Sequence, residues 1–322
     1  MRIIKVNRND AGQRLDKFLG KAVKGLPQSL MYKYIRTKKI KVNRQRTVQN
    51  YFLSEGDEIQ LFIRDEFFES PENDVGALSR IKPKLDIVYE DENIMLLNKR
   101  PGVLVHEDSD AKDNTLIMHV KAYLAQRGEY DPDEENSFSP ALCNRIDRNT
   151  GGIVIAAKNA EALRVMNEKI RDNKIRKFYL CLVHGTPRKA SDTMYAYLKK
   201  DSVSNMVEVR DKKFEGAKEI ITAYHILEKR GGESLLEVEL ITGRTHQIRA
   251  HMAHIGHPLL GDGKYGVNRD EKRRGYKYQA LYAYKLEFLD DGEENILSYL
   301  SGKSFKINKN GIWFLDAAGE AK

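Results

Sequence analysis

The stretch CNRIDRNTGGIVIAAK, residues 143–158, combines a short charged segment with a continuous apolar run. Asp147 lies between Arg145 and Arg148, and two glycines separate this segment from the apolar residues 153–157. The apolar run predicts a buried strand, and the Gly-Gly pair predicts a turn in front of it. Charged side chains at the rim of a buried strand usually have a partner or a task. The stretch therefore predicts a site around Asp147 at the start of a central strand.

Size and composition indicate a soluble globular protein of more than one domain. The chain has 322 residues, of which 41% are hydrophobic and 32% are charged, and a single hydrophobic core seldom grows to this size. The longest apolar run, 153–157, is far too short to cross a membrane, and the N-terminus MRIIKVNRND lacks an apolar signal core. We therefore expect a cytoplasmic protein with no membrane partner.

The net charge bears on the kind of partner, and the cysteine content bears on disulfides and metal sites. An excess of 55 Lys and Arg over 47 Asp and Glu gives a net charge of +8, which suits a polyanion although many basic proteins bind none. Cys143 and Cys181 are the two cysteines. Two cysteines in a chain of this length indicate reduced thiols rather than a disulfide framework. The CxxC spacing of metal sites does not occur in the sequence.

Residues 1–64 are predicted to form a small α/β module. Apolar residues recur at helical spacing from Leu15 to Val23, a second helix follows Pro27, and short strands are expected at 40–42 and 58–63. The second helix and the turn after it are strongly basic and lie beside tyrosines. We expect these cations to contact RNA phosphates, the alternative being an ordinary solvated basic face. They are Lys33, Arg36, Lys38, Lys39, Lys41 and Arg44.

The remaining chain divides into a linker and a larger domain. Residues 65–84 are polar and acidic, contain two prolines, and are predicted to be a linker. From residue 85 to 322, strands are expected near 85–89, 94–98, 153–157, 177–184, 222–227 and 235–242, and helices near 116–126, 161–170 and 246–255. Recurring hairpin signals favour an α+β fold with a largely antiparallel sheet over a doubly wound parallel sheet.

Two further segments place polar residues beside buried ones. In IRKFYLCLVHG, residues 175–185, Tyr179 belongs to an apolar strand. In LITGRTHQIRAHMAHIGHPLLGDGKYG, residues 240–266, a strand ends at a glycine, and Thr245 is expected to cap a helix on which Arg249 borders the buried stripe. Arg249 is then free to pair with a carboxylate from elsewhere, which would keep that carboxylate ionised. A purely structural ion pair is the alternative.

Four histidines in the last segment raise the question of a metal. His251 and His254 are three residues apart, a spacing that can serve zinc, but no Glu lies within the helix to act as a base. His246 and His257 fall near opposite ends of the helix. Helix capping and phosphate contacts explain these side chains more simply, and we expect no metal.

Taken together, these segments resemble the RluA family of pseudouridine synthases over nearly the whole chain. Residues 144–152, NRIDRNTGG, are similar to the family signature H-R-L-D-x-x-T-S-G, and 242–251, TGRTHQIRAH, match T-G-R-x-H-Q-[IL]-R-x-H. Residues 98–106, NKRPGVLVH, resemble the family's N-K-P-x-G segment. The N-terminal pattern resembles the S4-like RNA-binding domain of members that act on large-subunit ribosomal RNA. Asn144, Gly151 and Arg100-Pro101 depart from the family pattern without removing a catalytic group.

The resemblance implies an isomerase that converts uridine to pseudouridine in RNA, with large-subunit ribosomal RNA as the expected substrate, no cofactor, and a monomeric enzyme. Asp147 would be the catalytic carboxylate, Tyr179 would stack on the target base, and Arg249 would pair with Asp147. The uridine must leave its stack to be reached, and Arg145 would fill the vacancy. Whether Asp147 attacks C6, attacks C1′ or abstracts a sugar proton stays open. The expected RNA contacts near this site are Arg145, Arg148, Arg244, His246 and Gln247.

Two other classes of function stay open at this point. One is a noncatalytic RNA-binding or assembly factor, in which Asp147 would be dispensable. The other is a metal-dependent hydrolase, in which the histidines would bind zinc. The joint presence of Asp147, Tyr179 and Arg249 argues against the first class, and the missing zinc-protease motif argues against the second.

Overall fold

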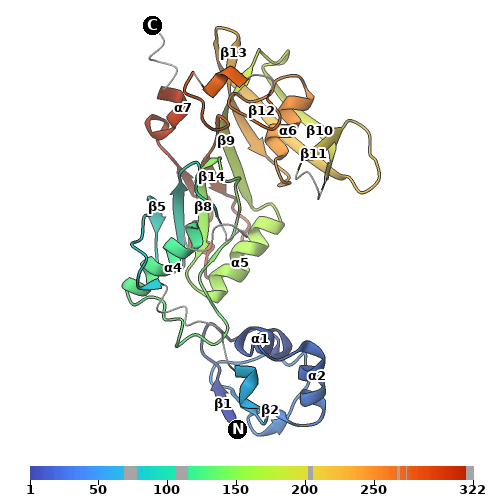
Figure 1. Cartoon of the computed structure of the whole chain (residues 1–322), viewed down its shortest axis with the longest axis vertical. Coiled ribbons are helices and arrows are strands. Elements are labelled where there is room, and N and C mark those ends of the chain that lie inside the picture. Colours follow the sequence, from blue (N-terminus) through green and yellow to red (C-terminus); the bar gives the residue numbers. More distant parts are fainter. Residues whose placement is uncertain (69–77, 106–114, 202–205, 267–268, 273, 317–322) are drawn as a thin grey trace. The chain divides into compact units, whose positions relative to one another are not determined.

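A computed structural model describes residues 1–68, 78–105, 115–201, 206–266, 269–272 and 274–316 (Figure 1). The chain forms two compact units. The first contains Met1–Lys84, Ile117–Ala141 and Ala157–Arg164, and the second contains Leu85–Leu116, Leu142–Ala156 and Val165–Lys322. This division differs from the boundaries at 64 and 84 predicted above, because segments from beyond residue 116 pack with the N-terminal residues.

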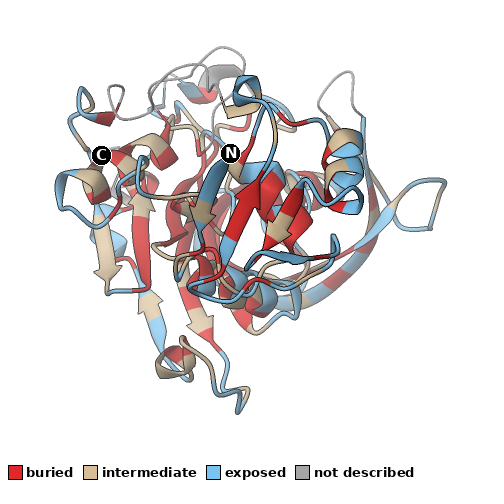
Figure 2. Ribbon diagram, turned by 90° about the horizontal axis from the view of Figure 1, so that it is seen from below, coloured by how far each residue is buried: buried red, intermediate tan, exposed pale blue. Residues whose placement is uncertain are grey.

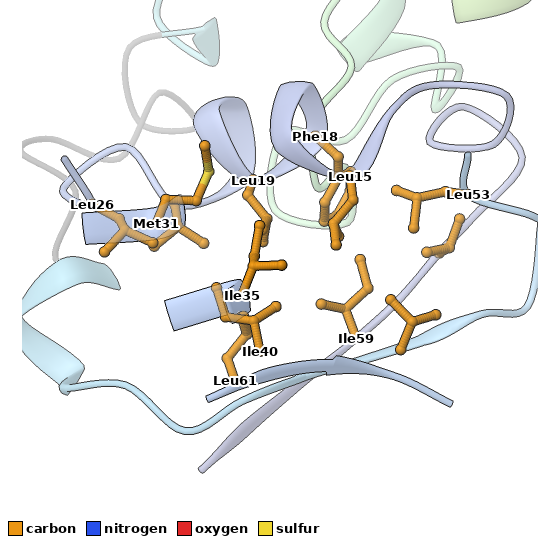
Figure 3. Close-up of a cluster of buried hydrophobic side chains, with 13 residues drawn as sticks. Leu15, Phe18, Leu19, Leu26, Met31, Ile35, Ile40, Leu53, Ile59 and Leu61 are labelled. Atoms are coloured by element: carbon orange, nitrogen blue, oxygen red, sulfur yellow. The ribbon is translucent and has the colours of Figure 1, made fainter. Parts of the chain in front are cut away.

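The N-terminal part of the first unit is a four-stranded sheet covered by two helices. The strands β1 (Arg2–Lys5), β4 (Glu58–Leu61), β2 (Ile40–Val42) and β3 (Gln45–Arg46) pair antiparallel in that order. Helices α1 (Leu15–Ala22) and α2 (Gln28–Arg36) pack on one face. Figure 3 shows Leu15 and Phe18 of α1 pointing toward Ile59, and Ile35 of α2 lying near Ile40. The spacing of the apolar side chains thus gives one shared core.

Local chemistry accounts for the ends of these elements. Pro27 precedes α2 in an extended conformation, and Lys38, with a φ of 64°, follows its end. The β2–β3 turn consists of Asn43 and Arg44, both with positive φ, as a tight hairpin turn requires. Met31 and Ile35 of α2 are buried, and Leu30 and Tyr34 pack partly buried against the same cluster. Strands β1 and β3 were not predicted.

Part of the predicted linker belongs to the core of the first unit. Residues Asp65–Phe68 form the 3-10 helix η1, and Phe67 and Phe68 pack against the N-terminal cluster. Leu78 is buried. Residues 69–77 of the predicted linker lie outside the described residues, as does His106 of the NKRPGVLVH segment. Aromatic side chains therefore hold the start of this segment in place.

The second unit is built on a sheet that has eleven strands in the described part of the chain. Its order is β11 (Val207–Arg210), β10 (Ser191–Lys200), β12 (Lys218–Arg230), β13 (Glu233–Leu240), β9 (Ile175–His184), β14 (Leu281–Phe288), β8 (Gly151–Ala157), β6 (Ile94–Lys99) and β5 (Ile87–Glu90). β15 (Ser304–Lys306) pairs with β14, and β7 (Ala141–Leu142) with β8. Pairing is antiparallel from β11 to β14, whereas β14 and β8 are parallel. The expected mixed fold with a largely antiparallel sheet is confirmed.

Helices α4 (Leu116–Gln126), α5 (Ala160–Arg171), α6 (Gln247–His254) and α7 (Trp313–Asp316) complete the chain, with the 3-10 helices η2 (Arg269–Lys272), η3 (Ser298–Leu300) and η4 (Lys309–Gly311). Buried residues concentrate in the strands, and every residue of β8 is buried (Figure 2). Within the described ranges, no helix has both the length and the apolar character needed to cross a membrane.

Two glycines allow β8 to lie directly against β14. Gly152 has a φ of 121°, and a Cβ added there would overlap the backbone of Ala283. A Cβ on Gly151 would overlap the ring of Tyr282. The Gly-Gly pair therefore permits the close approach of two central strands, and it fixes the point at which the chain arrives from Asp147.

Candidate active site

Asp147 lies in the loop that connects β7 to β8. Hydrogen bonds attach this loop to β8: Cys143 N donates to the Ile155 carbonyl at 2.8 Å, and Ile155 N donates to Asn144 Oδ1 at 2.8 Å. Thr150 N donates to the carbonyl of Asp147 at 3.0 Å, which closes a tight turn. Asn144, where the resembled family has His, thus anchors the loop. The side chain of Asp147 keeps 26% of its surface exposed.

Arg249 of helix α6 contacts Asp147 directly. Its Nη1 donates to Asp147 Oδ2 at 2.7 Å, so the two side chains predicted to pair do lie together. Arg249 was expected at the edge of a buried stripe, but residues 247–252 of α6 are all buried. The guanidinium therefore reaches Asp147 from within the protein.

A second carboxylate, Asp262, holds the other side of the same guanidinium. Arg249 Nε donates to Asp262 Oδ2 at 2.7 Å and Nη2 donates to Oδ1 at 2.8 Å. Burial alone would lower the pKa of Arg249, but hydrogen bonds and charges of Asp262 and Asp147 raise it above its ordinary value. Burial would raise the pKa of Asp262, which Arg249 and two backbone amides lower instead. Both groups are therefore charged at neutral pH.

His246 also faces Asp147. Its Nε2 lies 4.0 Å from Asp147 Oδ2, and its Nδ1 lies 2.9 Å from Tyr265 Oη. Burial lowers the pKa of His246, an effect that the charge of Asp147 opposes, so the imidazole is neutral at neutral pH. The prediction that Thr245 caps this helix is wrong: His246 precedes α6 with a φ of 55°.

Gln247 has a structural role. Its Oε1 accepts hydrogen bonds from Thr242 Oγ1 and Arg244 N, and its Nε2 donates to Ile221 O and Thr222 Oγ1. These four bonds use the hydrogen-bonding capacity of the amide, and the residue is buried. Gln247 also lines the pocket described below, and its predicted RNA contact stays a prediction.

Tyr179 and Asp147 line the same pocket. This pocket opens to solvent, comprises about 370 Å³ of empty space with the open solvent included, and is also lined by Arg145, Arg244 and His246. The Tyr179 side chain is buried in β9, and burial followed by the charge of Asp147 raises the pKa of its hydroxyl. Tyr179 is therefore a neutral wall of the pocket. The rest of the lining consists of the apolar Ile146, Leu240, Ile248 and Leu281 and the polar Thr150, Gln247 and Arg249.

The three predicted arginine contacts near the site are exposed, as a phosphate contact requires. Arg145 and Arg244 line the pocket mouth. Arg148 donates from Nε to the carbonyl of Gly102 at 3.1 Å, so it also links its loop to the segment that follows β6. Their contact with RNA stays a prediction.

Lys99, at the end of β6, is a residue that sequence reasoning missed. It is 1% exposed, and its Nζ donates to the carbonyls of Arg100 at 3.2 Å, Val103 at 2.9 Å and Arg148 at 2.9 Å. Burial lowers its pKa to about 7, against the raising effect of Asp147. The only sequence signal is its place in NKRPG. Its three bonds join the loop after β6 to the loop that carries Asp147.

The remaining histidines point to separate partners. His251 contacts Thr222, His254 contacts Asp211, and His257 Nδ1 lies 2.8 Å from the carbonyl of His184. Burial lowers the pKa of His251 to about 4. Where the structure describes the chain, no group of three or more His, Cys, Asp or Glu side chains could hold a metal ion.

In the first unit, the predicted basic residues lie on α2, the turn after it, strand β2 and the β2–β3 turn. Lys33, Arg36, Lys38, Lys39 and Arg44 are exposed, and Lys41 is half-buried. Lys39 Nζ lies 5.2 Å from the ring centre of Tyr34, and Lys41 Nζ lies 5.6 Å from that of Phe62. The half-exposed Phe62 was not among the predicted residues. Cations beside aromatic rings suit single-stranded nucleic acid.

Comparison with known proteins relates this chain to a family of RNA-modifying enzymes. A family described as RNA pseudouridylate synthase matches residues 93–254, which include Asp147, Tyr179 and Arg249. An uncharacterized RNA pseudouridine synthase of Mycoplasma genitalium is 35% identical over 96% of this chain and 96% of its own. The chain belongs to the RNA pseudouridine synthase family.

Other pseudouridine synthases extend this result. Ribosomal large subunit pseudouridine synthase C of Vibrio parahaemolyticus is 33% identical over 85% of this chain and 83% of its own, and that of Escherichia coli is 30% identical over 92% and 91%. The solved structure of human RNA pseudouridylate synthase domain containing 1 superposes with a TM-score of 0.53 at 20% identity, covering 79% of this chain and 98% of its own. The latter shows a shared fold. The enzyme is an isomerase acting on RNA.

Proposed function

We propose that this pseudouridine synthase modifies uridines of large-subunit ribosomal RNA and that Asp147 is its catalytic carboxylate. The names of several relatives support the substrate, since they are ribosomal large subunit pseudouridine synthases. One observation supports the site above others: Arg249 holds Asp147 at 2.7 Å on the wall of an open pocket. An ionised carboxylate fixed beside a cavity suits nucleophilic or base catalysis.

The isomerisation breaks the bond between N1 and C1′ of a uridine and forms a bond between C5 and C1′; C5 releases its proton to solvent and N1 takes up a proton. We propose that the flipped uracil enters the pocket between Asp147 and Tyr179, which supplies an apolar wall. Arg145 and Arg244, exposed at the mouth, then contact the RNA on either side. Each of the three routes considered for Asp147 requires it to be ionised.

We also propose that residues 1–64 act as an S4-like RNA-binding domain ahead of the catalytic domain that begins at residue 85. Two helices on a small antiparallel sheet, with exposed cations on α2, support this proposal. Phosphate contacts from such a domain would position the RNA, and contacts in the pocket would choose the base.

The role of Asp147 is tested by Asp147→Asn, which keeps the shape but removes the charge. Release of tritium from RNA labelled at uridine C5 should fall by at least about 10³-fold, while RNA affinity changes little. Asp211→Asn is the matched control, because Asp211 is an exposed carboxylate on another loop. A rate near that of the wild-type enzyme would remove Asp147 from the mechanism.

The substrate is tested by mapping pseudouridines in cellular RNA with and without the gene. We expect the missing sites to lie in large-subunit ribosomal RNA and to return when the wild-type gene, but not Asp147→Asn, is supplied. Sites missing from transfer RNA alone would overturn the proposed substrate and leave the activity in place.

A further inference from the structure

The loop GDGKYG, residues 261–266, contacts both groups that face Asp147. It follows the segment after α6 and lies beyond the residues matched by the family. Asp262 binds Arg249, and Tyr265 contacts His246. One short loop therefore meets the two side chains that flank Asp147.

Burial and backbone hydrogen bonds fix the carboxylate of Asp262 in place. Its side chain is fully buried, and Oδ1 also accepts hydrogen bonds from Lys264 N at 2.9 Å and Tyr265 N at 3.2 Å. The planar guanidinium uses Nε and Nη2 on Asp262, so its orientation is set by two parallel bonds. Only Nη1 is then directed at Asp147.

Tyr265 fixes the orientation of His246 in a comparable way. Tyr265 Oη accepts a hydrogen bond from Val207 N of β11 at 3.1 Å, and it lies 2.9 Å from His246 Nδ1. If the tyrosine proton goes to Nδ1, the imidazole carries its own proton on Nε2, which faces the carboxylate of Asp147. The opposite tautomer would place a lone pair against that carboxylate. Electrostatics therefore favours the Nε2–H form.

The backbone of the loop is tightly constrained. Gly261 has a φ of 70°, and a Cβ there would overlap the carbonyl of Tyr278; a Cβ on Gly266 would overlap the carbonyl of Asp262. The carboxylate of Glu271 accepts a hydrogen bond from Gly261 N. These contacts leave Asp262 and Tyr265 little freedom, as the positioning of reacting groups demands.

We propose that Asp262 and Tyr265 are positioning residues for the isomerisation: Asp262 aims Arg249 at Asp147, and Tyr265 sets the tautomer and orientation of His246. This inference rests on the proposed role of Asp147. Neither residue touches the substrate, and each acts through the side chain that it holds. Binding of RNA by the exposed arginines should not depend on them.

The variant Asp262→Asn tests this proposal, because the direction in which the acid limb of its pH–rate profile moves shows whether Arg249 has left Asp147. The variant should lower kcat by about 10²-fold with KM nearly unchanged, because loss of the paired bonds lets Arg249 turn away from Asp147. The acid limb of the pH–rate profile should then move to higher pH. If Arg249 stayed in place, removal of a neighbouring negative charge would move that limb to lower pH or leave it unchanged.

Among the residues that the structure describes, the charged or titratable groups around Asp147 include Arg249, His246, Lys99, Tyr179 and Tyr265, with Arg145 and Arg244 in the lining of the same pocket. They are the same in wild-type enzyme and variant, so the difference between the two profiles reports the change at Asp262. A matched control is Asp291→Asn, which breaks the buried pair of Asp291 with Lys169 elsewhere in the second unit. Both variants should lower the melting temperature, and only Asp262→Asn should change kcat and the acid limb.

Tyr265→Phe keeps the ring packing and removes the hydroxyl, so it tests the inference even if Asp262→Asn does not fold. Nitrogen-15 spectra of the imidazole should show the Nε2–H tautomer of His246 in the wild-type enzyme and a mixture in the variant. The kcat of Tyr265→Phe should fall about tenfold with unchanged RNA affinity. An Nδ1–H tautomer in the wild-type enzyme, or a wild-type kcat in the variant, would overturn the role of Tyr265.

Different results would overturn the catalytic role of Asp147 and the positioning role of Asp262. A wild-type rate for Asp147→Asn would overturn the proposed catalytic role itself. An inactive Asp147→Asn together with a wild-type kcat and pH profile for Asp262→Asn would overturn only the positioning by Asp262. Equal losses of kcat in Asp262→Asn and Asp291→Asn, with unshifted acid limbs, would show that Asp262 contributes stability alone.

Discussion

Lys99 Nζ donates a hydrogen bond to the carbonyl oxygen of Arg148 at 2.9 Å, one residue after the catalytic candidate Asp147. The same ammonium binds two carbonyls of the loop that follows β6. A buried lysine thus joins two loops through backbone groups alone. Since unpaired buried carbonyls are costly, this contact contributes both to the shape of the site and to the stability of the second unit.

Lys99→Met should lower the free energy of unfolding near pH 7 by about 2–3 kcal/mol, because three carbonyls lose their donor. It should also remove a pH dependence. Burial lowers the pKa of Lys99 from 10.5 to about 7, so between those values the unfolded chain holds a proton that the folded chain lacks. Stability of the wild-type protein gains from this group as pH rises through that window. Urea unfolding at pH 7, 8 and 9 measures both effects.

The control for Lys99→Met is the same change at Lys229, an exposed residue of β12. Its stability should follow the wild-type pH dependence. Parallel stability curves for the wild-type protein and Lys99→Met would contradict a lowered pKa of Lys99.

Gly152→Ala should destabilise the protein by more than about 2 kcal/mol, since the added methyl group meets the backbone of Ala283 and the φ of 121° is strained for alanine. Activity should fall as well, because the displaced strand β8 begins directly after the Asp147 loop. Gly20→Ala is the matched control: Gly20 lies in α1 with open space around it, and alanine there should stabilise the helix by about 0.5–1 kcal/mol. Equal unfolding free energies for the two variants would refute the close strand contact.

Arg249→Ala should cost about 3–5 kcal/mol of stability, because it leaves the fully buried carboxylate of Asp262 without its cation. Adding Asp262→Ala should recover part of this loss, since the unpaired charge is then removed too. The measurement is a double-mutant cycle by chemical unfolding. Losses that simply add would indicate that the two residues do not stabilise each other.

Several elements could be predicted because their patterns are local. The helix expected at 116–126 is Leu116–Gln126, and the strands expected at 177–184 and 235–242 are Ile175–His184 and Glu233–Leu240. Strand β14 was missed although it lies at the centre of the sheet. Its place depends on pairing with Gly151 and Gly152, more than a hundred residues earlier, and such a pairing leaves no local signal. Strand β10 was missed as well. One of its buried positions is occupied by Ala196, whose small side chain gives only a weak apolar signal.

In the candidate site, too, some contacts could be predicted from the sequence and others could not. The contact between Asp147 and Arg249 could be expected, because two isolated opposite charges beside buried elements need partners. Asp262 was not predicted, since GDGKYG has the composition of an ordinary turn and its contact depends on how that turn returns to α6. Lys99 binds only backbone carbonyls, and these have no signature in the side-chain sequence. Gln247 lies in a recognised motif, yet its amide serves the fold.

Replacing three exposed cations, two in α2 and one in the turn that follows it, should weaken RNA binding and reduce its dependence on salt. Each phosphate contact to single-stranded RNA contributes about 0.7 to the logarithmic salt slope, so the loss of three contacts should flatten the slope by about two. The variant combines Lys33→Ala, Arg36→Ala and Lys38→Ala. A control with the same change in charge, on exposed residues of the second unit, combines Lys303→Ala, Lys306→Ala and Lys309→Ala. Titrations of both variants across a salt series separate local phosphate contacts from net charge: equal slopes in the two variants would show that α2 is no RNA anchor, and its cations would then need another explanation.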